Sequence, residues 1–209
     1  MAKKTAAVTC NPQSRLAAVV DSVIQLPFRP RGKSPGVASF TLSLAAALKV
    51  CGLDLECDFA QALSCAAAAS KQIRIAGGRN VTYFAGNNDA YGAAVYGAAK
   101  IYELMGGRAQ PSLLEEFSHM PLFSLSASDS VNVVESPEGD KGERLFEKLR
   151  DAGYASSLIA LEGGRVERLY TLIFALQIAA ADAAKRKGLA VPYFLTAKKK
   201  LRISDEMIY

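Results

Sequence analysis

The chain has 209 residues, which is enough for one large domain or two small ones. Half of the residues are hydrophobic and 22% are charged, so the composition excludes a disordered chain and a fibrous repeat. The net charge of +5 does not indicate a nucleic-acid partner, because the basic residues concentrate at 185–187 and 198–202 without interleaved aromatic side chains. These runs are better explained as a solvated face or as an attraction for a phosphorylated metabolite.

The first 75 residues predict two short strands and three helices. A β-branched run precedes the turn Asn11-Pro12, and Ser14 is placed to cap the helix that follows. A loop rich in proline, glycine and basic residues comes next, and Gly52 separates two alanine-rich helical segments. The predicted strands are residues 5–9 and 21–26, and the predicted helices are residues 14–20, 37–50 and 58–73.

After the turn Gly77-Gly78, strands and helices alternate. The predicted strands are residues 81–85, 131–134 and 157–161, and the predicted helices are residues 90–105, 141–152 and 165–187. This order predicts an α/β fold, a three-layer α-β-α sandwich with a parallel sheet. Ligands of such sheets bind at the carboxyl ends of the strands, where residues 86–89 and the segment around His119 are expected.

The sequence also argues against several locations and sites. The longest nearly uncharged apolar run, residues 169–181, is shorter than the ~20 residues that a membrane-spanning helix requires. No continuous apolar stretch follows Lys3 and Lys4, so we expect no secretory signal, no membrane contact and a cytoplasmic location. A single histidine argues against a metal site. The cysteines lie among Ala, Val and Leu without C-x-x-C spacing and are predicted to be buried thiols: Cys10, Cys51, Cys57 and Cys65.

Residues 86–105 hold two features that are candidates for chemistry. Gly86 to Asp89 follow a strand and open a helix. Their small polar residues are placed to cap that helix, or their backbone N–H groups are placed to receive an anion. Lys100 and Glu103 are adjacent on one helix face, which is ordinarily an exposed ion pair. Because small residues such as Gly97 make this helix slim, we expect the pair to be partly buried beside a strand end.

The only histidine lies in a second candidate segment. Glu115, Glu116 and His119 stand together just before Pro121. Histidine titrates near neutrality and suits proton transfer, although a lone histidine is more often structural until a partner is found.

Taken together, these segments resemble the sugar isomerase (SIS) domain family. The similarity is to the second of the paired domains in the isomerase part of glutamine-fructose-6-phosphate aminotransferases and of related glucosamine-6-phosphate deaminases. It runs from Tyr83 through Asp89-Ala90-Tyr91 and Gly97 to Glu103, and on to residues 116–121, with the family's interval of 16 residues between Glu103 and His119. It implies a full SIS domain at 76–190, the C-terminal part of another at 1–75, and a tail at 191–209.

The resemblance implies roles for individual residues. Glu103 would move a proton between C1 and C2 of an open-chain sugar, and His119 would assist ring opening. Lys100 would position Glu103. A tail lysine would hold the keto sugar as a Schiff base; Lys198 is favoured because it follows an alanine, while a solvated basic tail is an equal alternative and Lys199 stands next to it. The substrate-binding residues implied are Val37, Ser39, Gly86, Asp89 and Lys100.

The sequence also departs from the family. The family's phosphate-holding loop lies upstream of the strand that matches residues 5–9, and the tail lacks the family's Pro-Arg-Asn-Leu-Ala-Lys pattern. We therefore expect either a polypeptide that begins roughly 100 residues or more upstream, as ordinary domain sizes suggest, or a homodimer or partner chain that completes the first domain.

Two functions follow as expectations. The first is a cofactor-independent sugar-phosphate isomerase or amino-sugar-phosphate deaminase of the glucosamine 6-phosphate and fructose 6-phosphate type, which retention of Glu103 and His119 favours. The second is a non-catalytic module that binds a sugar phosphate, which the missing phosphate loop favours.

Overall fold

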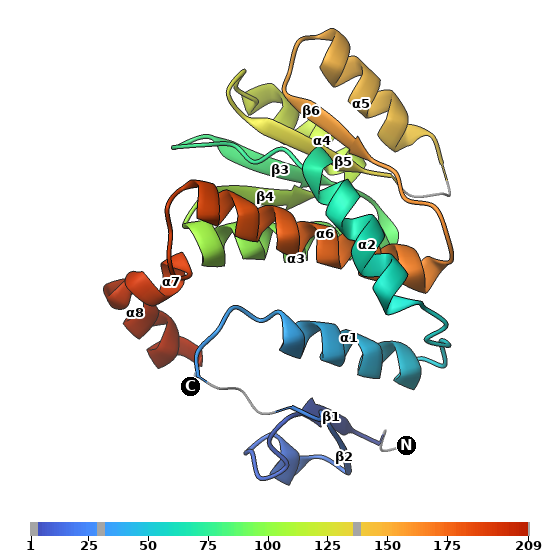
Figure 1. Cartoon of the computed structure of the whole chain (residues 1–209), viewed down its shortest axis with the longest axis vertical. Coiled ribbons are helices and arrows are strands. Elements are labelled where there is room, and N and C mark those ends of the chain that lie inside the picture. Colours follow the sequence, from blue (N-terminus) through green and yellow to red (C-terminus); the bar gives the residue numbers. More distant parts are fainter. Residues whose placement is uncertain (1–3, 29–31, 136–138, 209) are drawn as a thin grey trace. The chain divides into compact units, whose positions relative to one another are not determined.

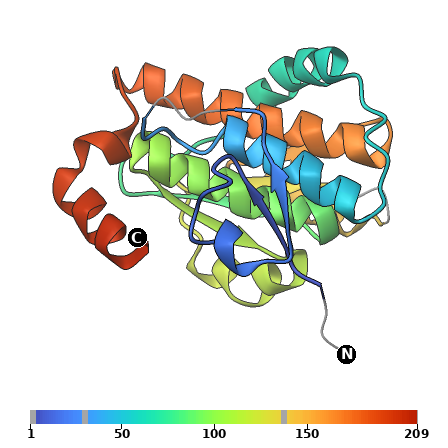
Figure 2. The same ribbon diagram turned by 90° about the horizontal axis from the view of Figure 1, so that it is seen from below.

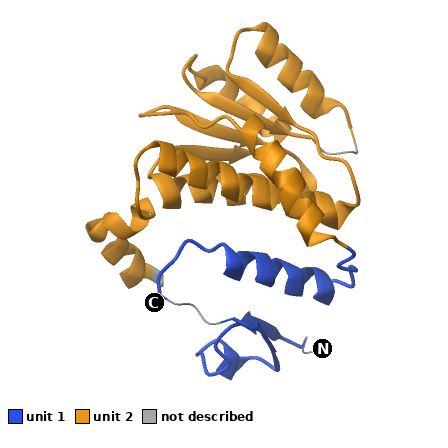
Figure 3. Ribbon diagram, viewed as in Figure 1, with its two compact units in different colours: residues 1–56 blue, residues 57–209 orange. Residues whose placement is uncertain are grey.

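The computed structural model of the chain describes residues 4–28, 32–135 and 139–208. These residues form two compact units, the first spanning Met1–Glu56 and the second Cys57–Tyr209 (Figure 3). Each unit has its own secondary structure, and each is described by itself below.

The first unit is a two-stranded parallel sheet with one long helix. Strand β1 (Ala6–Thr9) pairs with β2 (Ser22–Gln25), and α1 spans Ala38–Val50. The two strands and this helix confirm the sequence prediction. The helix predicted at residues 14–20 is wrong, because this segment forms only the single 3-10 turn η1 (Ala17–Val19), in which Ala17 N–H donates to Ser14 Oγ at 3.2 Å.

The second unit is built on a four-stranded parallel sheet in the order β4-β3-β5-β6 (Figure 1). Its strands are β3 (Val81–Ala85), β4 (Arg108–Ser112), β5 (Ser130–Val134) and β6 (Ser156–Ile159). The chain leaves the central strand β3 toward β4 and then crosses to β5 on the other side. The crevice between the carboxyl ends of β3 and β5 is therefore a topological switch point, where ligands of open α/β sheets bind.

Helices cover both faces of this sheet, which confirms the predicted three-layer α-β-α architecture. One face carries α2 (Phe59–Ala69), α3 (Asn88–Met105) and α6 (Arg165–Arg186), and the other carries α4 (Leu114–His119) and α5 (Lys141–Asp151) (Figure 1). The 3-10 turns η2 (Ser70–Gln72) and η3 (Pro121–Ser124) complete the layers. Alternate strand residues fill the core against α4 and α5, namely Tyr83, Ala85, Val131 and Val133.

The predicted burial of the cysteines is wrong for the thiols that the structure describes. Cys51 and Cys65 are exposed, and Cys10 and Cys57 are half-buried. Cys51 follows the last residue of α1, and Cys65 lies on the outer side of α2 while Ala62 and Ala66 face inward. A run of small apolar residues thus placed the thiol of Cys65 on the exposed side of a helix. In the described parts of the chain, no helix is both long and apolar enough to cross a membrane.

The C-terminal tail is helical and docks on the end of α3 (Figure 2). It forms α7 (Tyr193–Thr196) and α8 (Lys198–Ile208), neither of which was predicted from the sequence. Gly106 ends α3 in a left-handed conformation at φ 63°, and the Tyr193 ring packs directly over its Cα. Only glycine leaves room for this contact, because a Cβ at Gly106 would lie 2.4 Å from the ring.

We expect Gly106→Ala to destabilise the second unit by about 2–4 kcal/mol, of which roughly 1–2 kcal/mol is the cost of a left-handed alanine and the rest is the displaced ring. Gly188→Ala is the matched control, since Gly188 is also left-handed at φ 74° but a Cβ there would meet no atom within 4 Å. Thermal unfolding of both variants tests this prediction. Equal losses would show that the contact between Gly106 and Tyr193 contributes nothing.

Candidate functional site

The loops that follow β3 and β4 meet at the carboxyl edge of the sheet, where the sequence predicts residues 86–89 and the segment around His119. Asn87 Oδ1 accepts a hydrogen bond from Leu114 N–H at 3.2 Å, which ties the start of α3 to the start of α4. Gly86 N–H donates to Ser112 O at 3.1 Å, so this group is used within the sheet instead of facing an anion. Gly86 is needed for close packing, since a Cβ there would lie 2.9 Å from that of Ala90.

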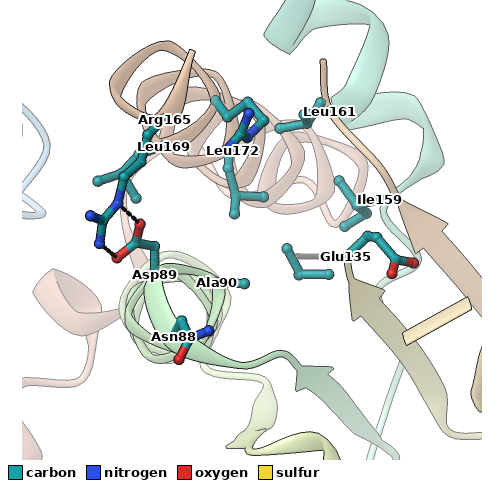
Figure 4. A pocket seen from close by; sticks show the side chains of 11 residues that line it. Asn88, Asp89, Ala90, Glu135, Ile159, Leu161, Arg165, Leu169 and Leu172 are labelled. Atoms are coloured by element: carbon teal, nitrogen blue, oxygen red, sulfur yellow. Dashed lines mark hydrogen bonds and ion pairs between the residues drawn. The ribbon is translucent and has the colours of Figure 1, made fainter. Parts of the chain in front are cut away.

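A pocket of about 460 Å³ opens at this edge, at the switch point between β3 and β5 (Figure 4). This volume lies within the range of small-molecule sites. Its lower side is formed by the first turn of α3, its far side by the ends of β5 and β6, and its roof by the first turns of α6. The lining residues combine charged and apolar side chains: Asn88, Asp89, Ala90, Val134, Glu135, Ile159, Leu161, Arg165, Arg168, Leu169 and Leu172.

Asp89 and Arg165 form a two-bond ion pair on one side of the pocket. Arg165 Nε donates to Asp89 Oδ2 at 2.5 Å and Arg165 Nη2 donates to Asp89 Oδ1 at 2.9 Å (Figure 4). Hydrogen bonding to Arg165 lowers the pKa of the Asp89 carboxyl below its usual value. Because both side chains are largely exposed, the pair adds little to stability, and its main effect is to hold the first turns of α3 and α6 together.

Glu135 lies on the opposite side of the same pocket (Figure 4). Its Oε2 is buried and has no hydrogen-bond partner among the described residues. Burial raises the pKa of this carboxyl, and the charges of Glu143 and Asp140 raise it further. A carboxylate held in this way destabilises the folded state, and it does so only where it is ionised.

The raised pKa gives a testable pH dependence. Because the pKa of Glu135 is higher in the folded chain than in the unfolded chain, its contribution to stability falls as pH rises from the unfolded to the folded pKa. Glu135→Gln is therefore expected to raise the melting temperature at pH 7 and to leave it unchanged near pH 3, where the carboxyl is protonated in both states. Thermal melts at the two pH values check this. An equal effect at both would show that the carboxylate charge is not responsible.

Lys100 and Glu103 form an ion pair near the other end of α3. The Lys100 side chain is only 2% exposed, whereas that of Glu103 is 37% exposed. Lys100 Nζ also lies 5.0 Å from the centroid of the Tyr96 ring. The predicted partial burial of this pair is confirmed, and the arrangement presents a half-exposed carboxylate on a fixed, buried cation.

Neighbouring polar groups hold this end of α3 in place. Tyr96 Oη accepts a hydrogen bond from Gln177 Nε2 at 2.8 Å, which joins α3 to α6. Burial raises the pKa of Tyr96 to about 12, so its hydroxyl stays protonated at neutral pH. Tyr102 Oη donates to the carbonyl of Ala109 on β4. The backbone that carries Glu103 is thus anchored to two neighbouring elements.

His119 does not join Glu103 within one chain. Glu103 lies 15 residues after the start of α3, which places it about 22 Å along the helix from the carboxyl edge. His119 is the last residue of α4 and is exposed near that carboxyl edge. One chain therefore places the two residues toward different edges of the sheet, and the convergence of their side chains on one cleft, which the sequence also allows between protomers, stays a prediction.

The remaining predicted site residues lie in three places. Lys198 is exposed at the first residue of α8, in the tail that docks on the end of α3 nearest Glu103. Val37 and Ser39 belong to the first unit, where Val37 precedes α1 and Ser39 is in its first turn. In the described residues, no group of three or more His, Cys, Asp or Glu side chains is placed to hold a metal ion.

Three charged residues of the pocket were not predicted from the sequence. Arg165 and Arg168 lie in the first turns of α6, and Glu135 directly follows the buried strand β5. Each is a charged residue at the boundary of an apolar element on the carboxyl side of the sheet. A search of the sequence for charged residues at these boundaries would have identified all three, because the ends of strands and starts of helices on this side line the ligand sites of parallel sheets.

Solved structures share this fold. The chain is similar to glucosamine-6-phosphate deaminase from Thermotoga maritima (TM-score 0.64, 19% identity, covering 89% of this chain and 63% of that one). It is also similar to tagatose-6-phosphate ketose/aldose isomerase from Escherichia coli (TM-score 0.66, 20% identity, covering 88% of this chain and 61% of that one). A third similar structure is the C-terminal domain of glucosamine-fructose-6-phosphate aminotransferase from Francisella tularensis (TM-score 0.62, 16% identity, covering 90% of this chain and 64% of that one).

The chain thus spans a little over three fifths of the length of these structures. No protein-family model matches the sequence, and no curated protein matches it either. The structural similarity confirms the predicted SIS-type fold.

Proposed function

We propose that this chain is a sugar isomerase domain protein that acts on a phosphorylated hexose or amino-hexose, as an aldose–ketose isomerase or a deaminase. The observation that carries the proposal is the pairing of the half-exposed carboxylate of Glu103 with the buried ammonium of Lys100. A surface ion pair needs no buried lysine, and burying a charge is costly unless it is paired. The fold supports the same substrate class.

In this proposal Glu103 is the base that moves a proton between C1 and C2 of the open-chain sugar, through an enediol intermediate. Lys100 fixes the carboxylate through its ion pair with Glu103 Oε2. The proton adjacent to the sugar carbonyl is acidic enough for a well-placed base, so the step uses no cofactor. Lys198, in the tail docked at the same end of α3, is the candidate amine for a Schiff base with the keto sugar.

His119 would assist ring opening from a second protomer, which accounts for its distance from Glu103 in one chain. Exposed apolar side chains beside His119 support such a contact: Met120 is 59% exposed and Phe123 is 84% exposed. We propose a homodimer, or a partner chain that completes the first domain, and a cytoplasmic location for the assembly. We also propose the division that the resemblance implies, with part of a first SIS domain at 1–75, a full SIS domain at 76–190 and a tail at 191–209.

The pocket at the carboxyl edge is the proposed second contact for substrate. Asp89 lines it. Val37 and Ser39 remain, by themselves, substrate contacts that the resemblance implies. Turnover of fructose 6-phosphate with ammonia and of glucosamine 6-phosphate, each followed by sugar product analysis, tests the proposal. Conversion of either substrate supports an enzyme.

A non-catalytic module that binds a sugar phosphate is the second candidate. Residues 4–28 and 32–56 of the first unit contain only β1, β2, η1 and α1, and no serine- and threonine-rich phosphate loop is described there. Saturable binding of fructose 6-phosphate by calorimetry, with no turnover of either substrate, would favour this candidate. No binding and no turnover would exclude both.

A further inference from the structure

A second pocket of about 460 Å³ lies at the opposite, amino-terminal edge of the sheet. It surrounds the start of β6, an edge strand that pairs only with β5. An edge strand leaves alternate backbone N–H groups without a ladder partner. The side chains that line this pocket include cations, hydroxyls and apolar groups: Lys71, Arg74, Phe146, Ser156, Ser157 and Leu158.

Two cations face this pocket without an anionic partner. Lys71 and Arg74 are both exposed, and neither takes part in an ion pair with any residue that the structure describes. Lys71 belongs to η2, and Arg74 belongs to the segment that follows it, so the two cations are close in sequence. Both line the same pocket. Two uncompensated cations at one cavity favour a doubly charged anion.

A buried hydroxyl in the same pocket also lacks a partner. Ser156 is 8% exposed, and its Oγ makes no hydrogen bond with any described residue. The neighbouring Ser157 differs, because its Oγ donates to Asn132 Oδ1 at 2.9 Å. A buried hydroxyl without a partner is costly, and a ligand oxygen would satisfy it.

The backbone beside the cations is held rigidly. Arg74 N–H donates to Asn132 Oδ1 at 2.8 Å, and Asn132 Nδ2 donates back to Arg74 O at 2.9 Å. Asn132 is fully buried in the middle of β5. This paired hydrogen bond fixes where the Arg74 side chain leaves the backbone, so the position is preorganised for a ligand.

The remaining wall of the pocket is apolar. Phe146 of α5 and Leu158 of β6 line it, and Phe146 is held by Arg150, whose guanidinium carbon lies 5.6 Å from the ring centroid. A ligand that carries only charge would leave this wall unused. A ligand with an anionic group attached to a flat or apolar organic group would contact both the cations and the apolar wall.

We propose that this pocket binds a phosphate monoester, with the phosphate on Lys71, Arg74 and the Ser156 hydroxyl and its organic group against Phe146 and Leu158. The site is at the opposite edge of the sheet from the carboxyl-edge pocket. The proposal does not depend on the isomerase function, because it uses neither Glu103 nor any residue of that pocket.

Calorimetric titration with inorganic phosphate and with phenyl phosphate tests the proposal on the full chain. Phenyl phosphate is expected to bind more tightly than inorganic phosphate, because only the ester reaches the apolar wall. Lys71→Gln and Arg74→Gln are each expected to weaken binding of both probes about tenfold, the effect of losing one charge-assisted hydrogen bond. Lys185→Gln, which removes an exposed charge from the end of α6, is the control and should leave binding unchanged.

The Ser156→Ala variant separates binding from folding. Because Ser156 Oγ has no partner, its removal should leave the melting temperature without phosphate equal or higher, yet weaken phosphate binding roughly fivefold. Ser112→Ala is the matched control, since Ser112 Oγ is also buried and without a partner but lies at the carboxyl end of β4.

Specific outcomes would overturn the proposal. They are the absence of binding of either probe at millimolar concentration, and binding that Lys71→Gln, Arg74→Gln and Ser156→Ala all leave unchanged. Phosphate binding that Glu103→Gln abolishes would also overturn it, because the anion would then sit at the proposed active site. Loss of sugar-phosphate turnover alone would bear only on the isomerase proposal.

Discussion

Glu103→Gln is expected to lower turnover of a sugar phosphate by about 10²–10⁴-fold, the usual contribution of a positioned general base. The amide has the shape of the carboxylate but cannot accept the proton from the sugar carbon. Lys100 would keep a polar neighbour, since its Nζ can donate to the amide oxygen where it now donates to Glu103 Oε2. We therefore expect the variant to fold and to bind sugar phosphate, with the loss confined to kcat.

Steady-state kinetics of Glu103→Gln beside Glu147→Gln measure this effect. Glu147 is an exposed carboxylate on α5, so its replacement controls for loss of one negative charge. A matching melting temperature shows that the fold is intact. Turnover of Glu103→Gln equal to that of the parent would mean that another group takes the proton, and the proposal for Glu103 would fail.

A mixed-variant experiment extends the same result to the dimer. If His119 reaches Glu103 of another protomer, a Glu103→Gln chain and a His119→Asn chain are each inactive alone. Mixing them assembles some sites from one intact Glu103 and one intact His119. Recovery of activity on mixing supports the shared site, and its absence in a mixture shown to contain mixed dimers contradicts it.

The sequence predicted most of the second unit because its local patterns agree with the tertiary structure. Strand β3 is apolar, and helices α3 and α6 contain long runs of small or apolar residues that are buried in the structure. Glycine or polar residues flank these elements, so pattern and burial coincide. Strand β4 was missed. It reads Arg-Ala-Gln-Pro-Ser, and its proline is tolerated because β4 is an edge strand, where one side of the backbone needs no ladder partner.

The candidate sites were less predictable, because they depend on which elements end side by side. The interval from Glu103 to His119 is a distance along the chain, whereas α3 returns Glu103 to the amino-terminal side of the sheet before β4 carries the chain back. The pocket at the start of β6 brings η2 and the segment after it together with α5 and β6, which come much later in the chain. No local pattern joins Arg74 to Phe146.

Asn132 is the residue whose substitution should cost the most stability. It lies in the middle of the apolar strand β5 and is fully buried. Its amide accepts from Arg74 N–H and Ser157 Oγ, and donates to Arg74 O and to Tyr83 O, the latter at 3.2 Å. One side chain thus joins β5 to β3, to β6 and to the segment after η2.

Asn132→Ala is expected to lower the free energy of unfolding by about 3–5 kcal/mol, because it leaves several buried donors and acceptors without partners. Ser157→Ala is the control: it removes one of these hydrogen bonds and should cost only about 1 kcal/mol. Urea unfolding of both variants measures the difference. A cost for Asn132→Ala no larger than that for Ser157→Ala would show that water replaces the amide, and then Arg74 would not be held for a ligand either. A large cost together with weaker phosphate binding under native conditions would tie the stability of this strand to the anion site that it supports.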